Sequence, residues 1–157
     1  MPASATAQRQ QTLTTTTSTA IPTLLVAEPN PTEALYFKAL YEAAGFAVVL
    51  THSGTEMLGC LKHVHPDLLV LNSQLPGQSG VKVCHQIKAE VTLGSIPLVL
   101  FNTDADLAGM IAAYEAGADY YVVKDKEYGQ QALAHTIITQ VLGYSPQQML
   151  METTSLA

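Results

Sequence analysis

The chain has 157 residues, of which 48% are hydrophobic and 13% charged, so it has the size of one domain and enough apolar side chains for a core. The formal net charge is −6, and Arg9 is the only arginine. This balance argues against nucleic-acid binding, which needs a basic surface. The sequence contains neither an apolar run of the ~18 residues that span a membrane nor a signal pattern, so we expect a cytoplasmic protein without membrane contact.

The two ends of the chain differ in composition from its middle. Residues 1–22 are rich in Thr, Ser, Gln and Ala without apolar periodicity, which predicts a disordered tail. A Thr-rich segment that is phosphorylated is the alternative interpretation. Residues 144–157 form a second tail, in which a capping pattern from Ser145 to Gln148 predicts a short helix over about 146–152. The domain itself is expected at 23–143.

Short apolar runs alternate with helical patterns between these tails. Strands are predicted over 23–27, 46–50, 67–72, 96–101 and 120–123. Helices are predicted from the cap at Asn30 to Ala44, from the cap at Ser53 to about Val64, and over 81–89, 104–116 and 127–142. The inward stripe of the first helix is expected to be Phe37, Leu40, Tyr41 and Ala44. Because four strands are apolar without alternation, both faces of the sheet should be covered, which predicts an α/β protein with a doubly wound, five-stranded parallel sheet.

Ligand sites in such sheets lie beyond the carboxyl ends of the strands. The segments around those ends are VAEPNP (26–31), PDLLVLNSQLPGQSG (66–80), IPLVLFNT (96–103) and AGADYYVVKD (116–125). Together they resemble the receiver domains of two-component response regulators. The resemblance covers roughly 23–143. It implies the flavodoxin-like receiver fold with strand order 2-1-3-4-5, and a pocket formed by Glu28, Pro29, Asn72, Asn102 and Lys124.

The sequence departs from the receiver pattern at three pocket positions. The phospho-acceptor aspartate is replaced by Asn72, whose amide is a poor nucleophile. In the acidic pair that helps to hold Mg²⁺, Pro29 offers no ligand, and Asn102 lacks the hydroxyl that meets the phosphate. Only Glu28 and Lys124 match the family's chemistry. We therefore predict a degenerate receiver, or pseudo-receiver, with no catalytic residue, no cofactor and weak or absent Mg²⁺ binding.

The resemblance also indicates how the remaining pocket residues should interact. We expect Glu28 to pair with Lys124 across the cleft, while Asn72 and Asn102 fill the pocket with neutral hydrogen bonds. Whether this pocket fixes a signalling conformation or is only a packed group of loops stays open. Tyr121 occupies the position of an aromatic that rotates inward in phosphorylated receivers. We expect it either to rest in one rotamer or to cover the edge of the sheet.

The helix at 104–116 has few charges and an excess of apolar residues. Its large apolar side chains at helical spacing are Leu107, Met110, Ile111 and Tyr114. They are too many for one buried face, so some should be exposed. In receivers this helix, strand 120–123 and helix 127–142 form the partner surface. The leading hypothesis is a stand-alone, non-enzymatic module that binds proteins through this surface, a second copy included, independently of phosphorylation.

Two other hypotheses remain at this stage. The first is a receiver in a phosphorelay that still accepts phosphate, at a non-standard residue. The second is a small-ligand binder of flavodoxin-like shape. Cys60 and Cys84 are too few for a disulfide framework and are expected to be packed thiols. A metal site is not expected from the histidines, because His63 and His65 are two positions apart and do not share a helix face.

Overall fold

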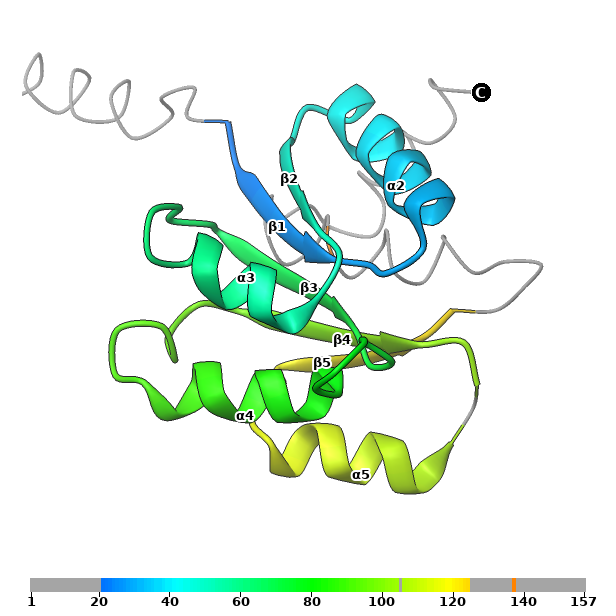
Figure 1. Cartoon of the computed structure of the whole chain (residues 1–157), viewed down its shortest axis with the longest axis vertical. Coiled ribbons are helices and arrows are strands. Elements are labelled where there is room, and N and C mark those ends of the chain that lie inside the picture. The colour runs from blue at the N-terminus through cyan, green and yellow to red at the C-terminus, as the bar shows by residue number, and fades with distance from the viewer. Residues whose placement is uncertain (1–20, 105, 125–136, 138–157) are drawn as a thin grey trace, which may run out of the picture.

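The computed structural model describes residues 21–104, 106–124 and 137. The predictions for tail residues 1–20 and 144–157, and for helix 127–142 apart from Ile137, lie outside the described residues. Within them, five strands alternate with four helices, as Figure 1 shows. The elements are β1 (Thr23–Ala27), α2 (Pro31–Ala43), β2 (Ala47–Thr51), α3 (Gly54–Cys60), β3 (Leu68–Asn72), α4 (Gly80–Ala89), β4 (Leu98–Asn102), α5 (Leu107–Glu115) and β5 (Tyr120–Val123).

The strands form one sheet in the order β2-β1-β3-β4-β5, and every neighbouring pair is parallel. This confirms the predicted architecture and strand order. The predicted tail ends one residue too late, because the carbonyl of Pro22 already accepts a hydrogen bond from the Ala47 amide of β2, at 2.9 Å. Among the described residues, no helix is long and apolar enough to cross a membrane.

Successive residues of each strand point to opposite faces of the sheet, so the sheet carries two separate cores. On one face, Leu25 and Leu71 belong to the apolar cluster that packs under α3, α4 and α5. On the other face, Leu24 and Val70 belong to the cluster that contains the inward side chains of α2. Ile137 is fully buried in this second cluster. Both faces are therefore covered, as the unbroken apolar runs predicted.

The buried stripe of α2 differs from the predicted one. Ala34, Phe37 and Tyr41 are buried, whereas Leu40 is 37% exposed and Ala44 is also exposed. Both sets fit a helical period, because α2 is apolar on two opposite sides. The outward side also presents large apolar side chains, Leu35 at 65% and Tyr36 at 55% exposure. The helix rotation is set by the aromatic rings, since Phe37 and Tyr41 pack with centroids 4.2 Å apart.

Two helices are shorter than the sequence pattern predicted. After Cys60 the hydrogen bonds change from the α-helical to the tighter 3₁₀ pattern, in which an amide bonds to the carbonyl three positions back. The Lys62 amide bonds to the Gly59 carbonyl, and the His63 amide bonds to the Cys60 carbonyl. The helix expected from 104 begins at Leu107, because Asp106 is its N-cap and accepts from the Ala108 amide at 3.1 Å.

One half-buried lysine joins three segments at the edge of the sheet opposite to the strand carboxyl ends. Lys88 Nζ, near the end of α4, donates to the carbonyls of Gly94 and Ile96 at 3.1 and 2.7 Å. It also donates to Asp119 Oδ2 at 2.7 Å. Nearby, Cys84 is fully buried, and this burial raises the pKa of its thiol to about 11. Both cysteines are free thiols, as expected.

Candidate functional site

The parallel register brings the expected pocket residues to one edge of the sheet. Ala27 lies opposite Leu71 and Asn102 opposite Val123, so Glu28 follows β1 beside Asn72, and Lys124 follows β5 beside Asn102. The ladders continue past the strands, since the Glu28 amide bonds to Thr51 O at 2.9 Å and the Lys124 amide to Asn102 O at 2.6 Å. The sequence therefore placed the pocket on the correct edge.

Glu28 is a buried carboxylate whose hydrogen-bond donor is neutral. Glu28 is only 6% exposed, and its Oε2 accepts a hydrogen bond from Asn72 Nδ2 at 2.7 Å. Burial raises the pKa of Glu28, while the Asn72 hydrogen bond and the charge of Lys124 act in the opposite direction. The amide of Asn72 thus solvates the carboxylate without neutralising it. An aspartate at position 72 would instead bring a second negative charge to this point.

Lys124 does not make the ion pair that the sequence analysis expected. Its Nζ lies 2.6 Å from Glu33 Oε2, and Glu33 stands on the first turn of α2. The predicted pair with Glu28 is wrong in this respect. The N-terminus of α2 is capped by Asn30, whose Oδ1 accepts from the Thr32 and Glu33 amides. The Glu33 carboxylate is therefore free to reach across the pocket to Lys124.

The two asparagines close the loops that follow their strands. Asn72 Oδ1 accepts from the Gln74 amide at 2.9 Å, and Asn102 Oδ1 accepts from the Thr103 amide at 2.8 Å. The bond to Gln74 is an Asx-type turn, in which the side-chain oxygen accepts from the amide two residues further on, whereas Thr103 directly follows Asn102. Asn72 therefore reaches into the pocket through its bond to Glu28, whereas the Asn102 side-chain oxygen bonds to the backbone of its own loop.

Gly80 lets the loop after β3 return tightly to the pocket. A Cβ atom on Gly80 would lie 2.4 Å from the backbone oxygen of Asn72 and 2.8 Å from Ser73 Cα, too close for any side chain. The Gly80 amide instead bonds to Ser73 O at 2.8 Å. Gly77, with φ of 79°, makes the turn that a residue with a side chain rarely adopts. Gly80 thus lets the loop pass directly against the backbone of Asn72.

The structure adds His52 to the pocket, which the sequence analysis did not include. His52 Nδ1 lies 3.0 Å from the carbonyl oxygen of Glu28, and its amide donates to Glu56 Oε2 at 2.7 Å. No motif marks this position, because the contact follows from the end of β2 lying beside the end of β1. Within the described residues, no three His, Cys, Asp or Glu side chains gather as metal ligands. In the part of the chain that the structure describes, Glu33 pairs with Lys124 and Glu28 lies within reach of its charge, while Pro29 contributes no carboxylate.

Tyr121 points inward under α5. Its side chain packs against the core cluster on the α3–α5 face, and its hydroxyl is buried. The hydroxyl lies beside Gly109 of α5, where a Cβ atom would stand 3.4 Å from Tyr121 Oη, an ordinary contact distance. The Tyr121 amide also donates to Tyr114 Oη at 3.3 Å. Tyr121 is thus half-buried on the edge strand β5, and the expectation that it rests in one rotamer stays a prediction.

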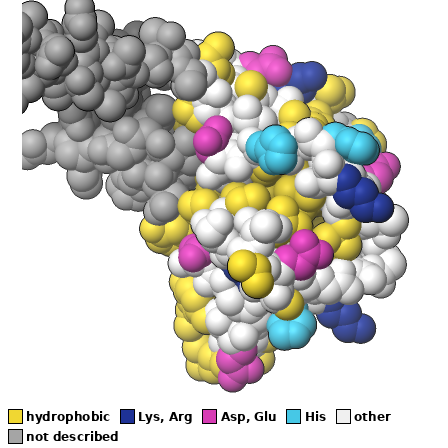
Figure 2. Space-filling view, turned by 90° about the vertical axis from the view of Figure 1, so that its left-hand side faces the viewer, with side chains coloured by type: hydrophobic (Ala, Val, Ile, Leu, Met, Phe, Trp, Pro, Cys, Tyr) yellow, Lys and Arg dark blue, Asp and Glu magenta, His cyan; other side chains and the backbone are white. Residues whose placement is uncertain are grey.

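The apolar excess of α5 is exposed on one side of the helix. Leu107, Ile111 and Tyr114 are 67%, 48% and 49% exposed, and their spacing of four and three residues places them in one stripe. Met110 is half-buried, and Ala113 is fully buried against the sheet. We call the three exposed residues the α5 stripe. Figure 2 shows hydrophobic side chains gathered at the lower left, at the level where α5 lies in Figure 1.

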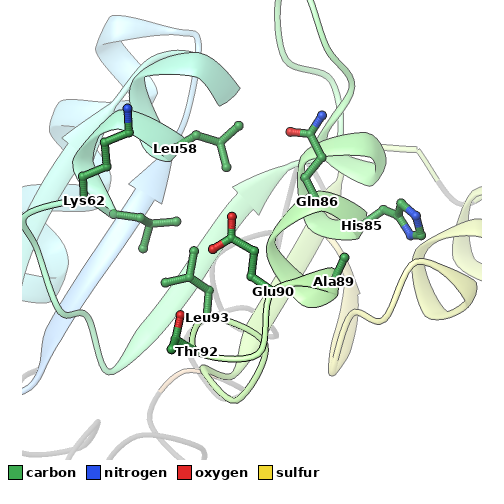
Figure 3. A pocket seen from close by; sticks show the side chains of 9 residues that line it. Leu58, Lys62, His85, Gln86, Ala89, Glu90, Thr92 and Leu93 are labelled. Carbon is green, nitrogen blue, oxygen red and sulfur yellow. The ribbon is translucent and has the colours of Figure 1, made fainter.

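A shallow hollow of about 640 Å³ lies between α3 and α4, away from the strand-end pocket (Figure 3). Leu58, Leu61 and Leu93 give it apolar walls, and Figure 3 shows the Glu90 side chain reaching into the space between the helices. Its lining residues come from the last turns of α3 and α4 and from the loop after α4. None of the expected pocket residues lines it.

Comparison with known proteins identifies the class of protein that this fold and pocket define. Residues 24–137 match the sequence model of the response regulator receiver domain, and the chain belongs to this family. The polar-differentiation response regulator DivK of Brucella ovis is 30% identical over 101 residues, which are 64% of this chain and 82% of DivK. The DNA-binding response regulator MtrA of Mycolicibacterium smegmatis is 29% identical over 101 residues. The matched region covers 64% of this chain but only 43% of MtrA, so the chain spans less than half of that relative.

Solved structures show the same likeness. A Chloroflexus aurantiacus protein assigned to the response regulators superposes with a TM-score of 0.71 at 26% identity, covering 78% of this chain and 99% of the other. The receiver domain of a signal transduction histidine kinase from Syntrophus aciditrophicus superposes with a TM-score of 0.70 at 25% identity, covering 80% and 93%.

Proposed function

We propose that this chain is a pseudo-receiver, a signalling module that binds other proteins through the α5 stripe and β5 and does so without phosphorylation. The observation that carries the proposal is Asn72, whose amide donates to Glu28 at the place where receivers carry the aspartate that accepts phosphate. An amide has no anionic oxygen with which to attack phosphorus, so an acyl phosphate cannot form on it. The proposal assigns the chain no catalytic residue and keeps the cytoplasmic location expected from the sequence.

The inward position of Tyr121 supports a pocket that holds one conformation. In receivers the aromatic at this position turns inward when phosphate arrives, whereas Tyr121 is already packed against the core. Its backbone amide bonds to Tyr114 of the α5 stripe, so the stripe and the inward ring are connected. We therefore infer that the α5 stripe is presented permanently rather than on phosphorylation.

The α5 stripe has the chemistry of a protein-binding surface. Three large apolar side chains on one helix side are costly to leave in water, at roughly 25 cal/mol for each Å² that a partner would cover. The stripe carries no charged residue. A partner with a complementary apolar face, a second copy included, is the expected occupant.

The experiment compares one substitution in the stripe with two controls. Ile111→Glu places a charge on the exposed stripe. Ala113→Glu is not used, because Ala113 is fully buried and the charge would disrupt the core. Val91→Glu makes a similar change at an apolar residue that is 95% exposed elsewhere, and Asn72→Ala alters the pocket. We expect Ile111→Glu alone to abolish self-association in sedimentation, or partner binding from cell extract, with circular dichroism unchanged.

The opposite pattern would refute the proposal. If Asn72→Ala abolished association and Ile111→Glu did not, the pocket would be the functional site. A phosphodonor that strengthened binding by the wild-type chain would favour a receiver that accepts phosphate at another residue.

A further inference from the structure

The ammonium group of Lys124 is almost enclosed and is already paired. Its side chain is only 15% exposed, and the ring centroid of Phe101 lies 5.9 Å from Nζ. The partner is the carboxylate of Glu33 at 2.6 Å, which reaches the pocket from α2 and is 46% exposed. The positive charge of the pocket is thus met by an acidic side chain of the chain itself, at the solvent side of the pocket.

The neighbouring backbone donors are occupied in the same way. The amides of Gln74 and Thr103 stand at the ends of β3 and β4, and each donates to an asparagine side-chain oxygen. An ammonium group and converging backbone amides are the donors that proteins use to bind phosphate and related oxyanions. Here every one of these three donors already has an oxygen acceptor from the chain, and only the acceptor on Lys124 carries a charge.

Glu33 differs from the two asparagines in having no other structural task that the structure shows. The N-terminus of α2 is capped by Asn30, so the helix does not depend on the Glu33 side chain. An ion pair with a half-exposed carboxylate contributes little net stability. The geometry therefore suggests that the pair matters for what the pocket can bind.

We propose that Glu33 occupies, with its own carboxylate, the place that a small phosphate-type oxyanion would take beside Lys124, and so excludes such anions from the pocket. The inference rests on the proposed function, because it names the residue that keeps the pocket independent of phosphate. It concerns non-covalent binding only and involves no transfer of a phosphoryl group.

The test is a titration of the full chain with inorganic phosphate at constant ionic strength and neutral pH, followed by the backbone amide NMR signals of Asn72, Thr103 and Lys124. The wild type should show no saturable change. Glu33→Ala should bind phosphate saturably in the millimolar range, at least about tenfold more tightly than the wild type. Glu33→Gln, which removes the charge and keeps the shape, tests the same point if the alanine variant does not fold.

Two further variants make the result specific. Glu42→Ala removes an equal charge from the exposed side of the same helix, where Glu42 pairs with Lys38 at 3.9 Å, and should behave as the wild type. Adding Lys124→Met to Glu33→Ala should abolish phosphate binding.

The proposal is overturned if the Glu33 variants titrate like the wild type, as they would if Lys124 turned to Glu28 instead. It is equally overturned if the wild type already binds phosphate, or if binding survives the loss of Lys124. Inorganic phosphate is not a phosphodonor, so a failure here leaves the proposed protein-binding function intact. That function would fail instead through a covalent phosphate adduct on the wild-type chain.

Discussion

Lys124 and Glu33 are 91 positions apart in the sequence, and their side chains meet at 2.6 Å. The contact joins the end of β5 to the first turn of α2 across the mouth of the pocket. It also gives the two carboxylates near Lys124 different partners, since half-exposed Glu33 makes the ion pair and buried Glu28 accepts from a neutral amide. The charge balance of the pocket is therefore set by α2 as well as by the strand ends.

Phosphodonors should leave the chain unmodified. Asn72 has no anionic oxygen, and the Glu28 carboxylate is held by the Asn72 amide. We expect no stoichiometric increase in intact mass after incubation with acetyl phosphate and Mg²⁺. A stoichiometric phosphate adduct, whether acid-stable or acid-labile, would contradict the phosphorylation-independent mechanism.

Magnesium should not stabilise the fold. The pocket has Glu28 as its buried carboxylate, while Pro29 and Asn72 supply no negative charge. The melting temperature should therefore be the same with and without millimolar Mg²⁺ at matched ionic strength. Because a ligand that binds only the native state must stabilise it, a saturable rise in melting temperature would show that a metal site exists.

Glu28 should make stability depend on pH. Burial raises its pKa in the folded chain above the ordinary 4.5, so the folded state holds the proton more tightly than the unfolded state. Its stabilising contribution is therefore complete below the ordinary pKa and is lost as pH rises through the folded pKa. We expect Glu28→Gln to be more stable than the wild type at pH 7, with the difference vanishing towards pH 4 in urea denaturation.

The control for this prediction is Glu42→Gln, because Glu42 is exposed on the outward side of α2. Its stability should follow that of the wild type throughout the pH range. If Glu28→Gln were less stable than the wild type at neutral pH, the ionised carboxylate would have to be stabilising, and the burial argument would be wrong.

Lys88 should be the most sensitive lysine of α4. Its ammonium group serves two carbonyls and the Asp119 carboxylate, and its side chain is 13% exposed. Lys88→Met leaves these acceptors without their donor, so we expect a loss of about 2 kcal/mol in the free energy of unfolding. Lys82→Met, at an exposed position of the same helix, should change it by less than about 0.5 kcal/mol. Equal effects of the two substitutions would show that the Lys88 contacts are not stabilising.

The strands were predictable because a strand that is buried on both faces appears in the sequence as a short, uninterrupted apolar run. β1 and β5 have the predicted bounds, and β2, β3 and β4 differ from them by one or two residues. Helix rotation was harder to predict, because α2 is apolar on two sides. A pattern containing Leu40 fits the helical period as well as one containing Ala34, and only the packing of Phe37 and Tyr41 on the sheet decides between them.

The pocket was predictable in its members but not in its pairing. Strand ends and the family resemblance located Glu28, Asn72, Asn102 and Lys124, all of which lie at one edge of the sheet. The sequence could not show which carboxylate Lys124 would meet. A glutamate is common at the third position of a helix, so the presence of Glu33 there did not indicate that its side chain would pair with Lys124.

The backward turn at Gly80 has a consequence for engineering. Because Gly80 has no side chain, its backbone can approach the Asn72 carbonyl closely. This steric requirement does not depend on which side chain stands at position 72. The shape of the backbone at this place is therefore set by Gly80 and not by the side chain at position 72. Substituting side chains around this backbone could introduce reactive groups without moving the chain. The pocket is therefore a suitable scaffold for engineering synthetic switches.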